Sequence, residues 1–147
     1  MKKVIVYTDG ACRGNPGPGG WGVLLRHETH EKVFSGAEIL TTNNRMELFA
    51  AIKALSSLRI PCQVELYTDS KYLQQGISVW LPAWKKQSWK KSDKKAVKNV
   101  DLWQILDKEA ERHKIIWHWV KGHSGHPEND LVDSIANQAI DDFLRKK

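Results

Sequence analysis

The hydrophobic positions of the first forty residues predict three strands. Residues 4–7 form an apolar run with no polar face, as expected for a strand in the middle of a sheet. Residues 21–27 and 31–40 have the composition of strands and are separated by a short polar turn, so we expect an antiparallel meander. The stretch at 11–20, ACRGNPGPGG, is rich in glycine and proline and is predicted to be a loop.

The hydrophobic spacing then changes to that of a helix. Residues 41–58 begin with polar residues of the kind that cap helices. They continue with good helix formers whose apolar side chains share one broad face. Pro61 ends this helix, and residues 63–68, QVELYT, predict a second central strand.

The second half of the chain alternates between helical and strand-like segments. We expect, in order, a short helix that follows Asp69 and ends near Gly76, a helical segment at 79–86, an amphipathic helix at 100–113, a strand at 114–120, a Gly- and His-rich loop at 121–130 and a last helix at 131–147. Meander strands followed by β-α-β crossovers predict an α/β fold. The sheet is expected to be five-stranded and mixed, an antiparallel meander plus two parallel strands, flanked by helices on both faces.

The length and composition of the chain indicate the number of domains and the expected cellular compartment. The chain has 147 residues, of which 41% are hydrophobic and 27% charged, as in an ordinary single globular domain. Cys12 and Cys62 are too few for a disulfide framework and do not form a C-x-x-C pair, so we expect no structural zinc. No segment has the length of a membrane span, and the apolar run at 4–7 is too short for a signal peptide. We therefore expect a cytoplasmic protein that binds no membrane.

The charge indicates a polyanionic partner. The formal net charge is +6 and the pI about 9.3. Residues 85–98, KKQSWKKSDKKAVK, hold seven lysines and one aspartate. Four tryptophans lie within or beside this segment: Trp80, Trp84, Trp89 and Trp103. The alternative is that the excess charge serves solubility alone.

Two strands end in the same three letters. The segments VIVYTDG at 4–10 and VELYTDS at 64–70 both end an apolar run with Tyr-Thr-Asp. If these strands are parallel neighbours, Asp9 and Asp69 face each other across about 5 Å. Carboxylates so close repel unless a proton or cation intervenes, and oxygen ligands suit Mg²⁺ or Mn²⁺. The alternative is that each aspartate caps the following turn.

Three further residues are candidates for the same site. Glu47 is expected in the first turn of its helix, where it would point to the same edge of the sheet, or form half of a capping box with Asn44. Asp133 is expected near the start of the last helix, where interaction with the helix dipole is the alternative role. His123 lies in the loop KGHSG and is a candidate proton carrier, or only a solvated side chain.

Taken together, these segments resemble a known family, the bacterial single-domain form of type 1 ribonuclease H. The resemblance covers essentially the whole chain and rests on YTDGACRGNPGPGGWG, TTNNRMEL, YTDSKYLQQGI, WKKSDKKAVKNVDLW and WVKGHSGHPENDLVD. It implies a ribonuclease H-like fold in which the first and fourth strands are adjacent and parallel. It also implies one catalytic domain over 1–147, with a basic protrusion at about 80–98.

The resemblance further implies an activity. The family hydrolyses the RNA strand of RNA–DNA hybrids and leaves 5′-phosphate and 3′-hydroxyl ends, with two Mg²⁺ ions per site and Mn²⁺ as a substitute. Carried over by motif, Asp9 bridges both ions, Glu47 and Asp69 complete one side, and Asp133 holds the ion beside the nucleophile. His123 helps to move protons or release product. The expected state is a monomer with no obligate protein partner.

The resemblance also assigns substrate contacts. Telling RNA from DNA requires contacts to 2′-hydroxyls. The family makes these contacts around the first loop and the start of the first helix, here Cys12, Arg13, Gly14, Asn15, Thr42, Asn43 and Asn44. An ordinary tight hairpin and a helix cap are the alternative roles, and both can coexist with binding. Trp80 and Trp84 match aromatics beside the DNA strand, and Trp103 is expected to anchor the protrusion.

Basic residues complete the expected substrate contacts. Lys85, Lys86 and the neighbouring Trp89 belong to the protrusion, where lysines neutralise phosphates. Lys71 stands where relatives often have glutamine, which places a charge near the substrate.

Three other functions fit parts of this pattern. A nonenzymatic hybrid- or double-strand-binding module would keep the lysines and tryptophans but has no need of converging acids. A resolvase-like or integrase-like DNA nuclease usually lacks the lysine-rich protrusion and the GNPGPGG loop. A fragment of a reverse transcriptase is the third alternative.

Overall fold

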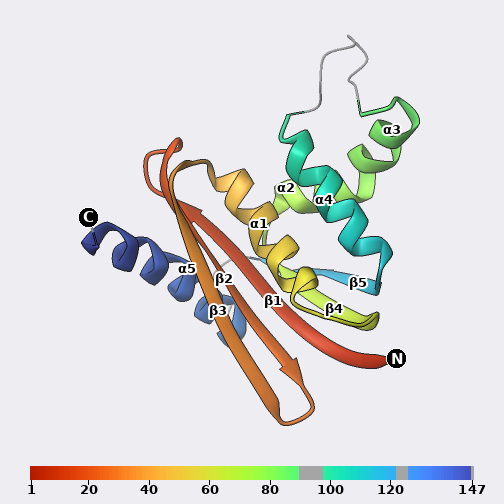
Figure 1. Ribbon diagram of the computed structural model, residues 1–147, viewed down its shortest axis with the longest axis horizontal. Coiled ribbons are helices and arrows are strands. Elements are labelled where there is room, and N and C mark those ends of the chain that lie inside the picture. Colours follow the sequence, from red (N-terminus) through yellow and green to blue (C-terminus); the bar gives the residue numbers. More distant parts are fainter. Residues whose placement is uncertain (90–97, 122–125, 147) are drawn as a thin grey trace.

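The computed structural model describes residues 1–89, 98–121 and 126–146. Its centre is a five-stranded mixed sheet with the strand order β3-β2-β1-β4-β5 (Figure 1). The strands are β1 (Lys2–Cys12), β2 (Gly17–His27), β3 (His30–Thr41), β4 (Cys62–Thr68) and β5 (Lys114–Trp119). The first three form an antiparallel meander, β1 is parallel to β4, and β4 is parallel to β5. The predicted fold class and sheet are confirmed.

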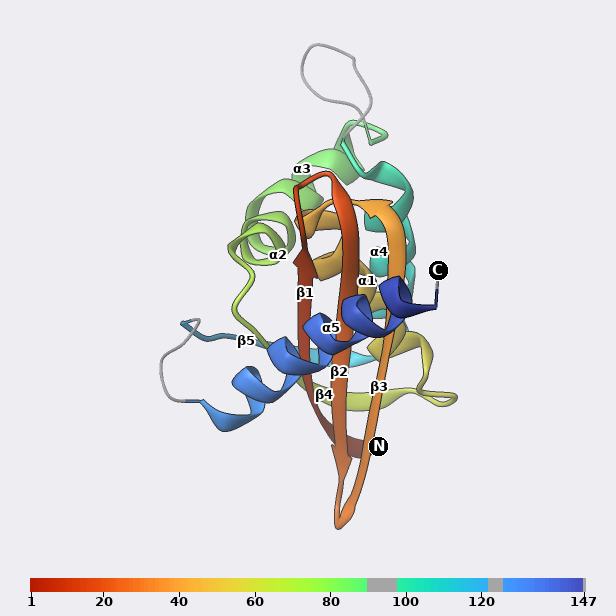
Figure 2. The ribbon, with the colours of Figure 1, turned by 90° about the vertical axis from the view of Figure 1, so that its left-hand side faces the viewer.

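Helices cover both faces of this sheet, as predicted. The helical segments are α1 (Asn43–Ser56), α2 (Lys71–Gln75), the π-helical turn η1 (Gly76–Trp80), α3 (Leu81–Lys86), α4 (Val100–Glu111) and α5 (Pro127–Arg145). Figure 2 shows α5 crossing β1, β2 and β3 on one face, with α1 and α4 behind the sheet. The hydrophobic core fills the space between the sheet and α1 and α4, where Val6, Leu55, Leu66 and Leu106 are fully buried.

The glycine-rich segment is mostly strand rather than loop. β1 continues to Cys12 and β2 begins at Gly17, so only a short turn separates them. Gly20 of this segment lets α5 approach closely, because a Cβ there would lie 2.5 Å from the carbonyl oxygen of Ala136. The small residues that suggested a loop therefore make room for the last helix on the sheet.

The short helix α2 ends at Gln75, near Gly76 as predicted, but Gly76 does not stop the helical backbone. Helical backbone runs on through α2, η1 and α3, and Gly76 itself is right-handed helical with φ −62° and ψ −48°. Its lack of a side chain has a packing reason, since a Cβ there would lie 1.9 Å from the ring of Trp103. Trp103 is fully buried, in keeping with its expected anchoring role.

The last helix also begins earlier than predicted. α5 starts at Pro127, so the predicted loop at 121–130 includes its first turn. Proline is favourable at the first helical position, because the missing N–H would have no partner there.

Two smaller expectations concern cysteines and membranes. Cys12 and Cys62 are both free thiols. Among the residues that the structure describes, no helix combines the length and apolarity needed to cross a membrane.

Candidate active site

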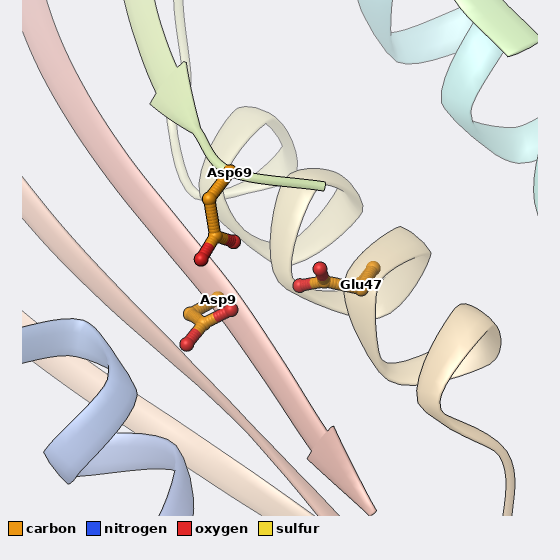
Figure 3. A group of neighbouring side chains, drawn as sticks. All are labelled: Asp9, Glu47 and Asp69. Carbon is orange, nitrogen blue, oxygen red and sulfur yellow. The ribbon is translucent and has the colours of Figure 1, made fainter. Parts of the chain in front are cut away.

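Three carboxylates from separate parts of the chain meet beside the sheet. Asp9 is on β1, Asp69 follows β4 directly, and Glu47 is on α1. One ligand oxygen from each lies within 4.8 Å of the others. Figure 3 shows the three carboxyl groups directed toward one another. The predicted approach of Asp9 and Asp69 is therefore present, although Asp9 lies within its strand and not after it.

Asp9 and Asp69 lie where the pairing between the parallel strands β1 and β4 ends. The last residues paired between β1 and β4 are Tyr7 and Tyr67, two positions before the aspartates. β1 continues past this point, where Asp9 pairs with Gly22 of β2, whereas β4 ends at Thr68. The space that opens between the strand ends receives both carboxylates.

α1 presents Glu47 from its second turn, not its first. The helix begins at Asn43, and its cap is Thr42, whose hydroxyl accepts a hydrogen bond from the N–H of Arg45. The capping box with Asn44 is therefore not present. The Glu47 side chain is buried and accepts a 2.6 Å hydrogen bond from the backbone N–H of Gly10. This contact fixes the carboxylate against β1.

The aspartates do not cap the turns that follow them. Ser70 is the N-cap of α2, and its hydroxyl accepts a hydrogen bond from the N–H of Leu73. Asp9 is inside a continuous strand. The capping alternative for this pair is wrong, so both carboxylates remain available for chemistry.

Burial and repulsion favour the neutral forms of two of these acids. Burial, followed by the charges of Glu47 and Asp69, raises the pKa of Asp9 well above its usual range. Burial and the charge of Asp69 likewise raise the pKa of Glu47, against hydrogen bonds that lower it. Buried carboxylates this close are costly to ionise together unless a cation joins them.

Asp133 completes the acidic pocket from the opposite face of the sheet. It lies in the second turn of α5, near enough to Asp9 for its side chain to help raise the pKa of Asp9. The pocket has a volume of about 400 Å³ and is lined by Asp9, Gly10, Asn43, Asn44, Glu47, Asp69, Ser70, Lys71, Tyr72 and Asp133. The four predicted acids and three of the predicted substrate contacts therefore share one cavity.

The donor set fits a hard divalent cation. Its ligand atoms are carboxylate oxygens, which Mg²⁺ and Mn²⁺ prefer. The ligand oxygens of Asp9, Glu47 and Asp69 lie within 4.8 Å of one another, and a bound divalent ion would offset the repulsion between these carboxylates. Asp9, Glu47 and Asp69 are the residues placed to hold it.

Two predicted features lie outside the described residues. His123 belongs to segment 122–125, and residues 90–97 form the central part of the predicted basic protrusion. The roles of both remain predictions.

The turn after β1 lies beside the start of α1, as predicted for a common binding surface. The side-chain oxygen of Asn15 accepts a 2.9 Å hydrogen bond from the N–H of Asn43. The thiol of Cys12 lies 3.4 Å from the carbonyl oxygen of Thr41. Arg13 is instead held by α5, where its guanidinium donates a 2.6 Å hydrogen bond to Asp141. Gly14, with φ 79°, is in the left-handed region that favours glycine.

The aromatic side chains of the protrusion form a closed cluster. Trp80 lies 5.7 Å from Trp84, which lies 5.5 Å from Trp103, measured between ring centroids. Tyr72 closes the cluster at 5.6 Å from Trp80 and 5.4 Å from Trp103. Trp89, which follows α3, is half-buried. These rings fix α2, η1 and α3 against α4.

The two described lysines of α3 differ in their surroundings. The ammonium of Lys85 lies 3.3 Å from Asp107 and 3.4 Å from Glu111, both on α4. Lys86 is exposed at the end of α3. The first lysine therefore tethers the helix, whereas the second is displayed to solvent.

Sequence reasoning missed the polar network behind the pocket. The Tyr72 hydroxyl accepts hydrogen bonds from Asn99 and from the indole N–H of Trp103. Arg45 of α1 bonds to the side chains of Asn99 and Asp101 at the start of α4. Tyr72 lies three residues after Asp69, and this spacing was the available signal.

Comparison with known proteins agrees with this geometry. The family model for RNase H matches residues 1–141. A ribonuclease H of Legionella pneumophila is 62% identical over 141 residues, covering 96% of this chain and 99% of the relative. One of Coxiella burnetii is 59% identical over 143 residues, covering 97% of this chain and 93% of the relative.

Solved structures show the same fold. LC9-RNase H1, a type 1 RNase H with the type 2 active-site motif, superposes with a TM-score of 0.87 at 32% identity, over 97% of this chain and 74% of that chain. LC11-RNase H1, solved in complex with an RNA/DNA hybrid, superposes with a TM-score of 0.71 at 26% identity, over 96% of this chain and 99% of that chain. With four acids gathered in one pocket and relatives this similar over almost their whole length, the chain belongs to the ribonuclease H family.

Proposed function

We propose that the acidic pocket hydrolyses the RNA strand of RNA–DNA hybrids, leaving 5′-phosphate and 3′-hydroxyl ends. The observation that carries this proposal is the convergence of Asp9, Glu47 and Asp69 within 4.8 Å, with Asp133 lining the same pocket. Membership of the family supports the reaction, and LC11-RNase H1 is a relative solved with such a hybrid. A binding module would gain nothing from buried acids that repel phosphate.

In this proposal the four acids hold two Mg²⁺ ions, for which Mn²⁺ can substitute. Divalent ions at such a site supply an activated water and neutralise charge on the departing oxygen. The chain's own contribution is to hold the carboxylates in place. Gly10 and the buried position of Glu47 fix one side, and α5 brings Asp133 from the other. His123 is proposed to move protons near the same point.

The substrate is proposed to lie across the pocket and the protrusion. Asn43 and Asn44 line the pocket, and Asn15 bonds to Asn43, so their amides are near the acids and suited to RNA 2′-hydroxyls. Lys71 also lines the pocket and is placed to meet a phosphate. The proposal extends to Cys12, Arg13, Gly14 and Thr42 on the RNA side, and to Trp80, Trp84, Lys85, Lys86 and Trp89 on the DNA side.

We also propose a simple context for this activity. Residues 1–147 act as one catalytic domain with a basic protrusion at about 80–98. The domain works as a monomer, without an obligate protein partner, in the reducing cytoplasm, where Cys12 and Cys62 stay free as they are here.

A strand-specific cleavage assay tests the proposal. A hybrid labelled separately on each strand is incubated with the protein, with Mg²⁺ or with chelator, beside duplex DNA and duplex RNA. We expect Mg²⁺-dependent cutting of the RNA strand of the hybrid only. Asp9→Asn should lower kcat by about 1,000-fold, or about 4 kcal/mol of activation free energy, while hybrid binding persists.

The exposed Asp142→Asn is the control, because it removes an acid far along α5 and should leave kcat unchanged. Binding of the hybrid without ion-dependent cutting would favour the nonenzymatic module. Equal cleavage of duplex DNA would favour a resolvase-like nuclease, and full activity of Asp9→Asn would refute the assigned site.

A further inference from the structure

A row of stacked side chains crosses the sheet just before the acids. The ring centroids of Tyr7 and Tyr67 are 4.9 Å apart, with an angle of 20° between the rings. The ring of His118 stacks on the other side of Tyr67, at 4.3 Å and 10°. The guanidinium of Arg26 lies 5.7 Å from the centre of the Tyr7 ring. The row thus joins β2, β1, β4 and β5, and we call it the stacked row.

The stacked row occupies a special place in the strand pairing. Tyr7 and Tyr67 are the last residues paired between β1 and β4, and Tyr67 pairs in turn with His118 of β5. Asp9 and Asp69 each follow two residues later, just beyond the last pairing between β1 and β4, while Asp9 stays paired with Gly22 of β2. Each Tyr-Thr-Asp segment therefore places a stacked tyrosine at the end of the β1–β4 pairing and an aspartate directly beyond it.

Repulsion between the carboxylates of Asp9 and Asp69 pushes β1 and β4 apart, and the stacked row opposes this repulsion. Asp9 and Asp69 carry like charges with ligand oxygens within 4.8 Å of each other, and the charge of Asp69 helps to raise the pKa of Asp9. Backbone hydrogen bonds between β1 and β4 stop before the carboxylates, so the ladder does not hold the two strand ends together beyond the tyrosines. Two large rings in face-to-face contact add attraction at the last paired position. The stacked rings therefore reinforce the spacing that the backbone pairing sets between the strands that carry the carboxylates.

The ends of the row connect to the other parts of the site. Arg26 donates a 2.9 Å hydrogen bond to Glu128 in the first turn of α5, five residues before Asp133. At the other end, the His118 ring is held by Glu65, 3.0 Å away. Both ends of the row are thus anchored, one of them to the helix that supplies the fourth acid.

We propose that Tyr7 and Tyr67, supported by Arg26 and His118, are positioning residues that hold Asp9 and Asp69 at the spacing a divalent ion needs. This rests on the proposed function, because it assumes that the acids bind the ion. Loss of the stack leaves the acids in place but lets their strands move apart, so the ion binds less tightly. The hybrid-binding residues around Asn43 and Trp84 are on other elements and are unaffected.

Ion binding measured without substrate tests this role. Binding of Mn²⁺ is followed by calorimetry in wild type, Tyr67→Leu and Tyr67→Phe, together with the Mg²⁺ concentration that gives half-maximal cleavage. Tyr67→Leu should weaken ion binding by about 10-fold and raise the Mg²⁺ midpoint in parallel, with KM for the hybrid little changed. Tyr67→Phe keeps the ring and should behave as wild type.

A second aromatic contact in the sheet gives a matched control. Trp21 and Phe34 meet edge to face across β2 and β3, with centroids 6.1 Å apart. Phe34→Leu removes this contact and should lower Tm while ion binding stays at the wild-type level. His118→Gln removes only the outermost ring, and it should weaken ion binding in the same direction by a smaller factor. This milder variant decides the question if Tyr67→Leu does not fold.

Two results would overturn the proposal. One is wild-type ion binding in a folded Tyr67→Leu or His118→Gln variant, and the other is an equal loss in Phe34→Leu. Asp9→Asn, measured beside them, separates this failure from that of the proposed function. If Asp9→Asn binds the ion as wild type does, the metal site itself is refuted, whereas normal binding in Tyr67→Leu alone refutes only the positioning role.

Discussion

The backbone N–H of Gly10 donates a 2.6 Å hydrogen bond to the Oε1 atom of Glu47, and so joins β1 to α1 at the acidic pocket. The contact needs a residue without a side chain. A Cβ at position 10 would lie 2.5 Å from the backbone nitrogen of Glu47 and 2.5 Å from the carbonyl carbon of Met46. Because both neighbours are backbone atoms, α1 would have to move as a whole.

We therefore predict that Gly10→Ala, which adds only one methyl group, lowers kcat strongly. Moving Glu47 away from Asp9 should lower kcat by about 100-fold. Overpacking should cost about 1–3 kcal/mol of the free energy of unfolding. Steady-state kinetics on the hybrid and urea unfolding measure the two effects. Gly36→Ala on β3 is the control, because its Cβ would meet the ring of Trp21 at 2.6 Å, and Trp21 is not among the residues that line the acidic pocket. Equal kcat values in the two variants would contradict the prediction.

The crowded acids predict an unusual pH dependence of the metal-free protein. Folding raises the pKa of Asp9 above its ordinary value of 3.8, mainly through burial, so the folded state binds more protons than the unfolded state. The free energy of unfolding should then fall as the pH rises above about 4. In chelator, the Tm of wild type should drop relative to that of Asp9→Asn by about 5 °C between pH 5 and pH 8. Millimolar Mg²⁺ should restore the Tm of wild type at pH 8 and leave the Tm of Asp9→Asn unchanged. A Tm difference between the two proteins that does not vary with pH would contradict the prediction.

Neighbouring lysines of α3 should contribute unequally to substrate binding. Lys85 is already paired with Asp107 and Glu111, whereas Lys86 has no ion pair within the part of the chain that the structure describes. Lys86→Ser should reduce the slope of log Kd against log salt concentration by about one, and raise KM more than it lowers kcat. Lys85→Ser should change the slope less. Hybrid binding measured from low to high salt gives both slopes, and a larger effect of Lys85→Ser would show that its ion pairs open on binding.

His113 should stabilise the fold only in its neutral form. Its Nδ1 atom accepts a 3.0 Å hydrogen bond from the N–H of Cys62, so the proton is on Nε2, which lies 3.3 Å from the carbonyl oxygen of Leu55. Burial lowers the pKa of His113. The unfolded state therefore binds more protons in acid, and this contribution to stability is present at pH 7.5 and lost as the pH falls below about 6.5.

The variant His113→Phe isolates this effect. It should cost about 1–3 kcal/mol at pH 7.5, because a buried N–H and a buried carbonyl lose their partner. The difference from wild type should shrink at pH 5. Urea unfolding at both pH values measures it, with the exposed His30→Gln as control. A difference that stays constant with pH would mean that protonation of His113 plays no part.

Local patterns were enough to predict the layers of the fold. The apolar runs at 4–7 and 63–68 predicted two central strands, and the structure makes them the adjacent parallel pair β1 and β4. Converging acids followed from that pairing, because parallel strands bring their carboxyl ends to one edge. Glu47 and Asp133 line the same pocket, although Glu47 is in the second turn of α1 and not in the first, as had been predicted. The catalytic roles of these acids stay a prediction.

Element boundaries depended on contacts that no local pattern contains. Gly76 follows the end of α2, as predicted, but the reason for its missing side chain is Trp103, which is distant in sequence and would lie 1.9 Å from a Cβ there. Gly20 was predicted to lie in a loop, but it is in β2, where a Cβ would lie 2.5 Å from the carbonyl oxygen of Ala136 on α5. The stacking of Tyr67 on His118 depends on the register between β4 and β5, which hydrophobic spacing does not specify.

The pocket draws its acids from residue 9 to residue 133, and the last of them arrives on α5, which must lie across β1, β2 and β3 before Asp133 reaches its place. A nascent chain therefore holds three of the four acids long before it has a finished cavity. The complete set of carboxylates can therefore form only after α5 has been synthesised, has left the ribosome and has packed against the sheet.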